Sequence, residues 1–236
     1  MIRTLILDSL IFIYTVVLAS AAMIMSFLDP TGKTSDFIVF LWAWLILRTA
    51  GVRVSVEGIE KLRPGSPRIY MANHRSHTDV WAILSSIPLS LKFIAKKELF
   101  WIPFVGQAIY MLGHIMIDRS NRVRAFRSLD RAAEKIRKGR SVLIFPEGTR
   151  AEEEKLNEFK KGGFVLAVKS KVPIVPIGIR GSLKILPKGS YSIKPGVIEI
   201  RIGDEIETSG YTMENKEMLI EKVRKAMEDL TGPGFA

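Results

Sequence analysis

The sequence predicts an α/β fold in which a mostly parallel sheet is flanked by helices, preceded by an N-terminal apolar two-helix membrane element. From Gly51 onward, runs of strand-type residues alternate with helical patterns, as is typical of a parallel sheet covered by helices. Two long apolar segments precede Gly51. The chain has 236 residues, enough for one large α/β domain and a membrane element. We therefore expect a membrane-embedded helical hairpin over residues 1–50 and an α/β domain over residues 51–236.

The first apolar segment, residues 5–28, is apolar apart from Asp8 and small hydroxyl residues. It is long enough to cross a bilayer core of roughly 30 Å, and it lacks the cleavage signal of a secretory peptide. The second segment, residues 37–50, would reach only about 20 Å as a helix, which is too short to span. These lengths favour a hairpin that dips into one leaflet; the alternative is a true span by residues 5–28 with the short helix packed against it. The residues expected near the membrane interface are Trp42, Trp44 and Arg48.

Seven runs of strand-type residues follow. They lie at residues 52–57, 68–72, 91–95, 114–118, 141–145, 174–180 and 197–202. Helical patterns are found at residues 79–87, 104–112, 122–138 and 162–170, with a last helix at 213–230. Pro173 and Pro176 suit an edge strand or an irregular strand that lines a pocket. Sites in such sheets collect at the carboxyl ends of strands, and residues 68–72 lead directly into His74.

The helix at residues 122–138 separates an apolar stripe from a basic side. The basic side is formed by Arg124, Arg127, Arg131, Lys135 and Lys138. It is either a solvated surface or a dock for anionic headgroups or an acidic carrier protein.

Composition excludes several kinds of site. The chain contains no cysteine, which rules out disulfides, thiolate metal sites and a cysteine nucleophile and fits a cytoplasmic setting. The formal charge of +11 favours anionic partners such as phospholipid surfaces or phosphorylated substrates. No nucleic-acid-binding signature is present, so we expect no nucleic-acid partner.

A histidine and a carboxylate follow the second strand, His74 and Asp79, five residues apart. On a continuous helix five positions turn through about 140°, so the two side chains would point away from each other. They can meet only if His74 lies on a loop and Asp79 lies in the first turn of the next helix, a start that Ser76 and Thr78 favour. The carboxylate could then orient the imidazole, and the imidazole could take a proton from a hydroxyl.

Three interpretations of this stretch compete. The simplest is a strand-to-helix turn with a capping aspartate and two surface histidines. A metal site could use His74, His77 and Asp79, but the remaining histidine, His114, is remote in the sequence and no second acidic cluster adjoins them. The third is the general-base pair, which the other segments favour.

Residues 93–97 and 113–119 each end a predicted strand with charged side chains. In the first segment Lys96 lies just before an apolar loop. It is either a solvated charge or a contact for a phosphate. The second delivers Asp118 and Arg119, which by themselves could form a structural ion pair.

Residues 141–150 combine a buried-type strand with a tight charged loop. The strand breaks at Pro146, and Gly148 permits a tight backbone turn. Glu147 and Arg150 then project from one compact loop, and arginine suits bidentate recognition of phosphate. Glu147 could bind a substrate hydroxyl or hold an arginine in position, and the sequence leaves both open.

Four ordered blocks resemble the motifs of glycerolipid acyltransferases. They are His74-x4-Asp79, residues 113–119, Phe145-Pro146-Glu147-Gly148-Thr149-Arg150 and residues 172–178. Each block alone has weak or moderate specificity, whereas four in order across residues 73–178 are specific. Within the family, the third block and the short chain are most similar to 1-acylglycerol-3-phosphate (lysophosphatidic acid) acyltransferases.

The resemblance implies transfer of a fatty acyl group from an acyl thioester to the sn-2 hydroxyl of 1-acylglycerol-3-phosphate, giving phosphatidic acid. It implies His74 as the general base and Asp79 as its orienter, without metal, cofactor or covalent enzyme intermediate. The donor would be an acyl carrier protein or coenzyme A thioester. The residues implied in the acceptor site are Arg119, Glu147, Gly148, Thr149 and Arg150. To these we add Lys96 as a phosphate contact, from its place at a strand end.

The residues themselves agree with direct attack by a substrate hydroxyl. The chain has no cysteine and no Gly-x-Ser-x-Gly nucleophile elbow. Direct attack needs a base, cations for phosphate and backbone donors for the developing oxyanion, and the loops near Gly148 or Asn73 are candidates for those donors. Because both lipid substrates partition into membranes, we expect the protein on the cytoplasmic face of the cell membrane, against an anionic surface.

Other functions stay open at this point. Acylation of another lysophospholipid or of glycerol-3-phosphate is the nearest alternative. A metal-dependent lipid phosphatase or hydrolase would use His74, His77 and Asp79, and a non-catalytic lipid-binding protein would need none of them. Acyl length, the identity of the donor and the oligomeric state are not determined by the sequence.

Overall fold

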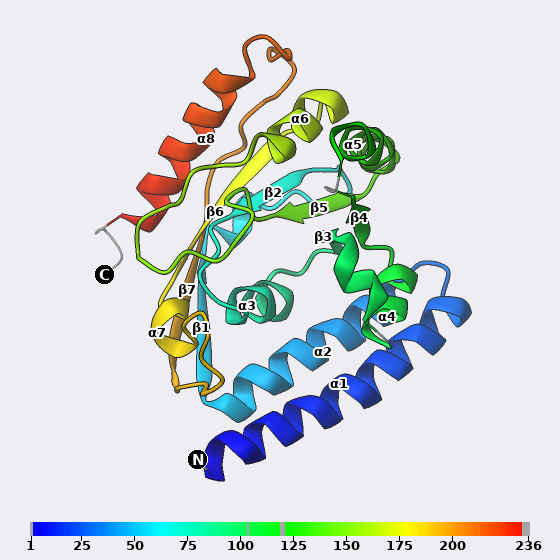
Figure 1. Cartoon of the computed structure of the whole chain (residues 1–236), viewed down its shortest axis with the longest axis vertical. Helices are drawn as coiled ribbons and strands as arrows, with labels where there is room; N and C mark the ends of the chain where they lie inside the picture. The colour runs from blue at the N-terminus through cyan, green and yellow to red at the C-terminus, as the bar shows by residue number, and fades with distance from the viewer. Residues whose placement is uncertain (1, 103, 119–120, 233–236) are drawn as a thin grey trace.

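A seven-stranded sheet forms the centre of the described chain (Figure 1). The structure is a computed structural model that describes residues 2–102, 104–118 and 121–232. The strands are β1 (Val52–Glu57), β2 (Ile69–Ala72), β3 (Leu91–Lys96), β4 (Ile115–Ile117), β5 (Ser141–Ile144), β6 (Ile174–Arg180) and β7 (Gly196–Ile202). Their order across the sheet is β1-β7-β6-β2-β5-β3-β4. Neighbouring strands are parallel except β6 and β7, so the predicted mostly parallel sheet is confirmed.

The strand and helix predictions beyond Gly51 are confirmed with small shifts at their ends. The predicted helices are α3 (Thr78–Ser86), α4 (Val105–Met111), α5 (Arg122–Arg137), α6 (Lys161–Ser170) and α8 (Lys216–Thr231). Three short helices were not predicted: η1 (Ile59–Lys61), η2 (Lys97–Trp101) and α7 (Ser182–Ile185). Segments of three to five residues are too short to show an apolar period.

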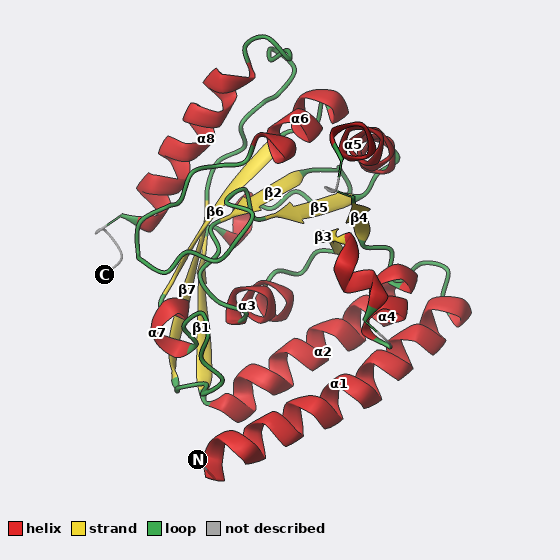
Figure 2. Cartoon of the chain, viewed as in Figure 1, coloured by secondary structure: helices red, strands yellow, loops and turns green. Residues whose placement is uncertain are grey.

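Helices cover both faces of the sheet, which explains why its strands are apolar on both sides (Figure 2). Along β2, Ile69 and Met71 join a core formed with α5, α6 and α8, whereas Tyr70 and Ala72 join a second core formed with α3 and α2 (Lys33–Ala50). All four side chains are fully buried. The alternation follows the two-residue period of a strand.

Two long helices, α1 (Ile2–Leu28) and α2, lie side by side along one edge of the molecule, with α2 between α1 and α3 (Figure 1). By length and composition α1 could cross a membrane, and only 6% of its most apolar window is buried. Its large apolar side chains point outward; among them are Phe12, Ile13, Val17 and Ile24. The apolar two-helix element is therefore present, and one of its faces is unpaired within the described chain.

The second helix is longer than the sequence suggested, because it begins at Lys33 rather than Phe37. Its start is set by Asp29, whose carboxylate accepts hydrogen bonds from the backbone and hydroxyl of Thr31 and of Thr34. These bonds hold the pKa of Asp29 well below its usual range. With 18 residues, α2 is about 27 Å long.

The strand that contains Pro176 lies inside the sheet, so the expectation of an edge strand is wrong. β6 is paired with β2 on one side and β7 on the other. The carbonyl of Pro176 accepts from the amide of Gly203, just past the end of the ladder with β7. The missing N–H of the proline points to that same side, so the ladder with β2 loses no hydrogen bond.

The central strands β2 and β5 are adjacent and parallel. The loops at their carboxyl ends, residues 73–77 and 145–160, therefore leave the sheet at the same edge. Those loops contain most of the residues singled out from the sequence.

Candidate active site

Asn73 fixes the point where β2 ends and the His74 loop begins. Its side chain accepts a hydrogen bond from the backbone nitrogen of Ile179, at 2.6 Å, and donates one to the carbonyl of the same residue, at 2.8 Å. The amide thus continues the ladder between β2 and β6 by one residue after the backbone has turned away. His74 consequently starts from a rigid position at the middle of the sheet.

The predicted pair of His74 and Asp79 is formed. His74 Nδ1 lies 2.9 Å from Asp79 Oδ2, and the same oxygen accepts from the backbone amides of Arg75 and Ser76, at 2.7 and 2.8 Å. Asp79 lies in the first turn of α3 and is fully buried. Because the carboxylate can only accept, Nδ1 carries the proton and Nε2 keeps its lone pair. This is the base-and-orienter arrangement expected from the sequence.

Glu147 organises the loop rather than facing the cavity. Its carboxylate accepts from the backbone amides of His74 and Asn157, both at 2.9 Å, and its side chain is buried. Burial raises the pKa of Glu147, and the two amide hydrogen bonds oppose that shift. In this arrangement Glu147 ties the His74 loop to the loop after β5. It differs from the two roles that the sequence left open, which were binding a substrate hydroxyl and holding an arginine in position.

The turn after β5 has the tight geometry that Gly148 was expected to allow. Gly148 has φ of 72°, in the left-handed region, and its amide donates to the carbonyl of Phe145 at 3.0 Å. Further along, the amide of Ala151 donates to the carbonyl of His74 at 2.8 Å. The loop therefore wraps around His74 and is fastened to it on both sides.

Arg75 is a buried residue of the site that sequence reasoning missed. Its guanidinium donates to the backbone carbonyls of Glu153, Glu154 and Ile179, which belong to the loop after β5 and to β6. Only 1% of Arg75 is exposed. An arginine beside His74 reads as a surface charge, and no local pattern reveals carbonyl partners more than seventy residues away.

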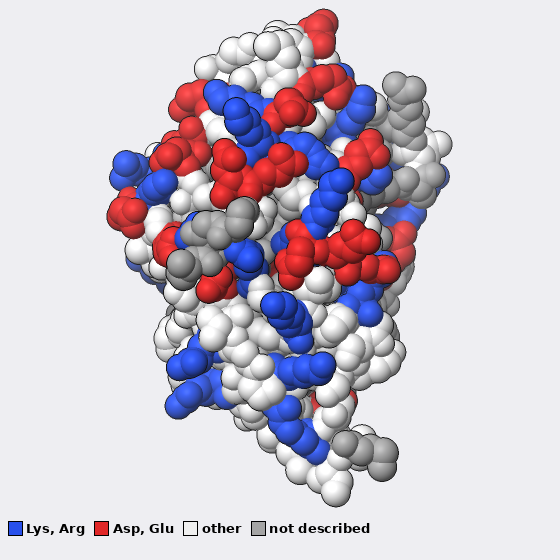
Figure 3. Space-filling view, turned by 90° about the vertical axis from the view of Figure 1, so that its left-hand side faces the viewer, with Lys and Arg blue, Asp and Glu red and all other residues white. Residues whose placement is uncertain are grey.

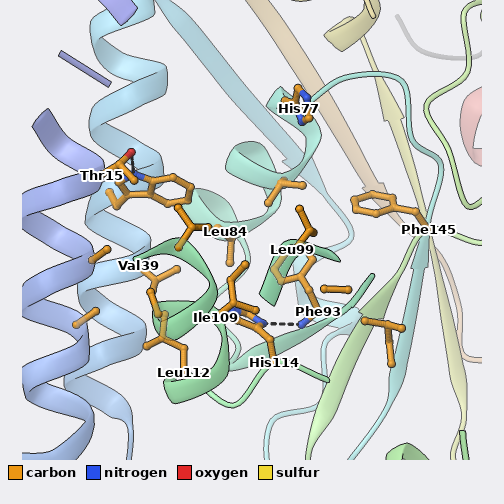
Figure 4. A pocket seen from close by; sticks show the side chains of 18 of the residues that line it. Thr15, Val39, His77, Leu84, Phe93, Leu99, Ile109, Leu112, His114 and Phe145 are labelled. Atoms are coloured by element: carbon orange, nitrogen blue, oxygen red, sulfur yellow. Dashed lines mark hydrogen bonds between the residues drawn. The ribbon is translucent and has the colours of Figure 1, made fainter. Parts of the chain in front are cut away.

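An apolar cavity of about 550 Å³ opens beside His74 (Figure 4). Its wall is built by elements of the N-terminal two thirds of the chain: α1, α2, α3, β3, α4 and the end of β5. Its lining includes Thr15, Val39, Leu84, Phe93, Ile109 and Phe145. The volume is within the usual range for small-molecule sites, and the lining suits a long apolar chain.

A second, polar cavity of about 360 Å³ adjoins the first. Thr149 and Arg150 line both cavities, and Lys155, Asn157 and Lys188 line the second. The two cavities therefore meet at the loop predicted to bind the acceptor, with apolar walls on one side and cations on the other.

His77 lies exposed at the N-terminal end of α3 and lines the apolar cavity with His74 (Figure 4). Partial burial lowers the pKa of His77, with further contributions from the positive charge of Arg150 and from the neighbouring imidazole of His74, and Asp79 opposes the shift. The lowered pKa favours the neutral form of His77 in the wall of the apolar cavity.

Two predicted site residues, Lys96 and Arg119, lie partly or wholly outside the residues that the structure describes. The backbone of Lys96 ends β3 opposite Ile117 of β4, and its side chain is outside the described part. Arg119 lies outside the described residues. Its predicted ion-pair partner, Asp118, is 3.1 Å from Lys97. The roles assigned to Lys96 and Arg119 stay predictions.

Trp42, which the sequence suggested lies near the membrane interface, packs against other parts of the protein. Its indole N–H donates to Thr15 of α1 at 3.0 Å, its ring meets Trp81 edge-on, and it lines the apolar cavity. Trp44 is exposed, in keeping with the expectation for that residue. The period of a helix places these two tryptophans on different sides, and the sequence alone did not show which side faces protein.

No group of three or more metal-ligand side chains is arranged to hold a metal ion within residues 2–102, 104–118 and 121–232. His114, which seemed remote in the sequence, lines the same cavity as His74 and His77. Its imidazole, however, is bonded to the backbone of Phe93 rather than to either histidine.

Comparisons with known proteins agree on one family. The family model described as Acyltransferase matches residues 53–180. The chain is 40% identical over 168 residues to a chloroplastic 1-acyl-sn-glycerol-3-phosphate acyltransferase of Arabidopsis thaliana, covering 70% of this chain and 46% of the relative. It is 33% identical over 186 residues to a 1-acyl-sn-glycerol-3-phosphate acyltransferase of Pseudomonas aeruginosa, covering 77% and 71%.

A solved structure extends the likeness to the whole chain. The crystal structure of the 1-acyl-sn-glycerophosphate acyltransferase PlsC from Thermotoga maritima matches with a TM-score of 0.81 and 28% identity, covering 100% of this chain and 99% of that one. Against the first curated relatives, by contrast, the chain spans about half of their length, 46% in both cases.

Proposed function

Because this chain belongs to the Acyltransferase family, we propose that it transfers a fatty acyl group from an acyl thioester to the sn-2 hydroxyl of 1-acylglycerol-3-phosphate, giving phosphatidic acid. The observation that carries the proposal is the hydrogen-bonded pair of His74 and Asp79 beside an apolar cavity. The resemblance that the four sequence blocks implied and the relatives' names support the same reaction.

In the proposed reaction His74 acts as the general base. Its Nε2 takes the proton of the acceptor hydroxyl while that oxygen attacks the thioester carbonyl. A carbon–oxygen bond forms, the carbon–sulfur bond breaks, and the imidazolium returns the proton to the leaving thiolate. Asp79 holds the ring in the required tautomer and stabilises the imidazolium. A positioned base of this kind typically contributes roughly 10²–10⁴-fold.

The two cavities support a division of the substrates between them. We place the acyl chain in the apolar cavity and the acceptor phosphate near Arg150, where the polar cavity begins. Lys96 and Arg119 remain proposed contacts to that phosphate. Glu147 acts on the acceptor only indirectly, through the loop that it holds.

Within the two loops proposed from the sequence to supply the oxyanion donors, near Gly148 and near Asn73, two donors are engaged elsewhere. The side-chain amide of Asn73 is bonded to Ile179, and the backbone amide of Gly148 is bonded to Phe145. The backbone amides of Thr149 and Arg150 have no hydrogen-bond partner within the described residues. We therefore assign the developing oxyanion to these two amides of the cavity wall.

The membrane is the proposed place of reaction, on the cytoplasmic face of the cell membrane. The exposed apolar length of α1 supports it. The start of α1 is joined to the loop before β7, because Arg3 donates to the carbonyl of Ile193 and Thr4 donates to Ser192. Figure 3 shows the face of the molecule that lies on the left in Figure 1. Over its lower part, the end at which Figure 1 places α7 and the start of α1, there are Lys and Arg side chains with few acidic ones. Such a surface suits anionic headgroups.

The acyl donor is proposed to be a thioester of acyl carrier protein or coenzyme A. The basic side of α5 supports an acidic or phosphorylated partner: Arg124, Arg127, Arg131 and Lys135 are all exposed. Lys138, counted with them, is paired with Glu134 at 2.7 Å.

The test is acyl transfer by purified protein in lipid–detergent micelles. Labelled 1-acylglycerol-3-phosphate, another lysophospholipid and glycerol-3-phosphate are each offered with both donors. We expect phosphatidic acid from wild type and roughly 10²–10⁴-fold less from His74→Ala, with metal chelators having no effect. Equal product from His74→Ala would contradict the proposal, and chelator-sensitive release of phosphate would support the hydrolase instead.

A further inference from the structure

His114 places an imidazole in the wall of the otherwise apolar cavity, between α4 and β4. Its Nδ1 lies 2.9 Å from the backbone nitrogen of Phe93 (Figure 4). A backbone N–H can only donate, so Nδ1 accepts and carries no proton. Burial, followed by the positive charge of Lys92, lowers the pKa of His114 to about 4, with Asp36 opposing, so the ring is neutral near pH 7. A neutral imidazole that accepts at Nδ1 carries its proton on Nε2.

That Nε2–H is a hydrogen-bond donor without a partner in the part of the chain that the structure describes. Among the described residues, the hydroxyl of Tyr70 is both unpaired and enclosed by packed protein, whereas the Nε2 atom of His114 is unpaired but not enclosed. Because His114 lines the cavity, the free donor opens onto cavity space. Its neighbours in the wall, Phe93, Ile109 and Leu112, are hydrocarbon side chains that offer no acceptor (Figure 4).

The strand register shows how deep this donor lies. Tyr70 is paired with Leu143, and Leu143 is paired with Phe93, so Phe93 is level with Tyr70, four residues before His74. At about 3.3 Å per residue, His114 therefore lies roughly 13 Å below His74 along the strand direction. An acyl chain whose thioester carbonyl is at His74 would meet His114 well along its length.

We propose that His114 is a specificity-determining residue that favours acyl chains carrying an oxygen atom, as a hydroxyl or keto group, at the depth of its Nε2. The inference rests on the proposed function, since only an acyl-binding cavity would present such a chain. A plain hydrocarbon leaves the donor unpaired in apolar surroundings, which costs binding free energy. A hydroxyacyl or ketoacyl thioester supplies the acceptor and removes that cost.

Two substitutions separate the roles of the two ring nitrogens. His114→Asn places an amide oxygen near the position of Nδ1, so it keeps the bond to Phe93 and withdraws the donor at Nε2. His114→Gln extends an amide N–H to the position of Nε2 and so keeps the donor. Ile109→Val is the matched control, because it alters the same wall without changing any polar group.

The experiment compares kcat/KM for unsubstituted octadecanoyl thioesters with that for isomeric hydroxyoctadecanoyl thioesters whose hydroxyl moves along the chain. Both coenzyme A and acyl carrier protein thioesters are used, with 1-acylglycerol-3-phosphate as acceptor. We expect wild type, His114→Gln and Ile109→Val to favour one or two neighbouring isomers over the others by roughly two- to tenfold, the worth of one neutral hydrogen bond. His114→Asn should lose this preference and still transfer the unsubstituted chain.

A wild-type profile that is flat across the isomers overturns the inference, as does a preference that survives in His114→Asn. Both results leave the proposed function intact, because the unsubstituted chain is transferred in each. Failure of the wild-type protein to transfer any chain would overturn the proposed function and the inference with it.

Discussion

The imidazole of His74 stacks on the ring of Phe145, with centroids 4.0 Å apart and an interplanar angle of 18°. Phe145 directly follows β5, and Asp79 binds the edge of the same imidazole from α3. The stack fixes the tilt of the ring and the hydrogen bond fixes its rotation. Two elements far apart in the sequence thus hold one side chain.

Replacing Phe145 with leucine should lower kcat by roughly three- to tenfold with little change in KM. Leucine keeps an apolar contact but loses the stacking geometry, which is typically worth about 0.5–1.5 kcal/mol. Initial rates over a range of acceptor concentrations measure the effect. Phe145→Tyr is the control, since it keeps the ring, and a leucine variant with wild-type kcat would show that the stack does not position His74.

Replacing Asp79 with asparagine should lower kcat by roughly 10²–10⁴-fold. The amide can donate to His74, which favours the tautomer whose lone pair is turned away from the acceptor. Asp130→Asn, which removes a surface carboxylate paired with Lys169, serves as control. Comparable losses in both variants would argue against a specific role for Asp79.

Replacing Arg75 with methionine should lower the free energy of unfolding by roughly 3 kcal/mol, because buried carbonyls lose charge-assisted donors. Activity should fall too, since the loop after β5 is no longer held to β6. Chemical denaturation in detergent measures the first effect. Arg131→Met, on the exposed side of α5, should change stability by no more than about 0.5 kcal/mol. Equal stabilities of the two variants would contradict the assigned role.

Acid should destabilise the wild-type protein more than His114→Asn. The pKa of His114 is about 4 in the folded chain and about 6.5 when unfolded. The unfolded state therefore binds a proton first as the pH falls, and stability drops between about pH 6.5 and pH 4, by a total on the order of 3 kcal/mol. Below pH 4 both states are protonated and the loss stops growing. Thermal unfolding of both proteins across this range measures the difference, and parallel curves would contradict it.

Polar substitutions on α1 should release the protein from vesicles. Ile13, Val17 and Ile24 lie on one side of α1 and are all more than half exposed. Changing the three to serine should reduce co-sedimentation with anionic vesicles and leave transfer to a micellar short-chain acceptor intact. Met218→Ser on α8 provides the control, since that residue is also exposed. Unchanged sedimentation of the triple variant would show that another surface binds the membrane.

Deletion of residues 1–50 would remove more than a membrane contact. Ala43, Ile46 and Leu47 of α2 are buried, and Leu47 belongs to the core that packs against α3. Loss of activity after that deletion would therefore report loss of folding as well. The surface substitutions on α1 avoid this ambiguity.

The sequence was most informative where function depends on neighbours along the chain. A strand followed by a helix start brings His74 and Asp79 together, and Gly148 sets a local turn; both can be recognised from a few residues. It was least informative where partners come from distant segments. Glu147 binds an amide seventy-three residues away, and His114 joins the cavity of His74 only through the order of the strands.

Helix positions followed the same rule. The apolar period located α3, α4, α5, α6 and α8 closely, because burial against one sheet imposes that period. The start of α2 escaped detection because side-chain hydrogen bonds of Asp29 determine it. The side on which Trp42 lies depends on α1, which no pattern within α2 describes.

The outermost helix contributes Thr15, Leu18 and Ala19 to the cavity wall, yet its opposite side has no protein neighbour within the described chain. The width of the acyl site is therefore set partly by whatever presses on α1 from outside. With α1 in a membrane, as proposed, lateral pressure in the surrounding lipid would act directly on the selection of acyl chains, and the bilayer would take the place of an outer protein layer. Selectivity measured in a detergent micelle and in a membrane of defined thickness should accordingly differ for the same polypeptide.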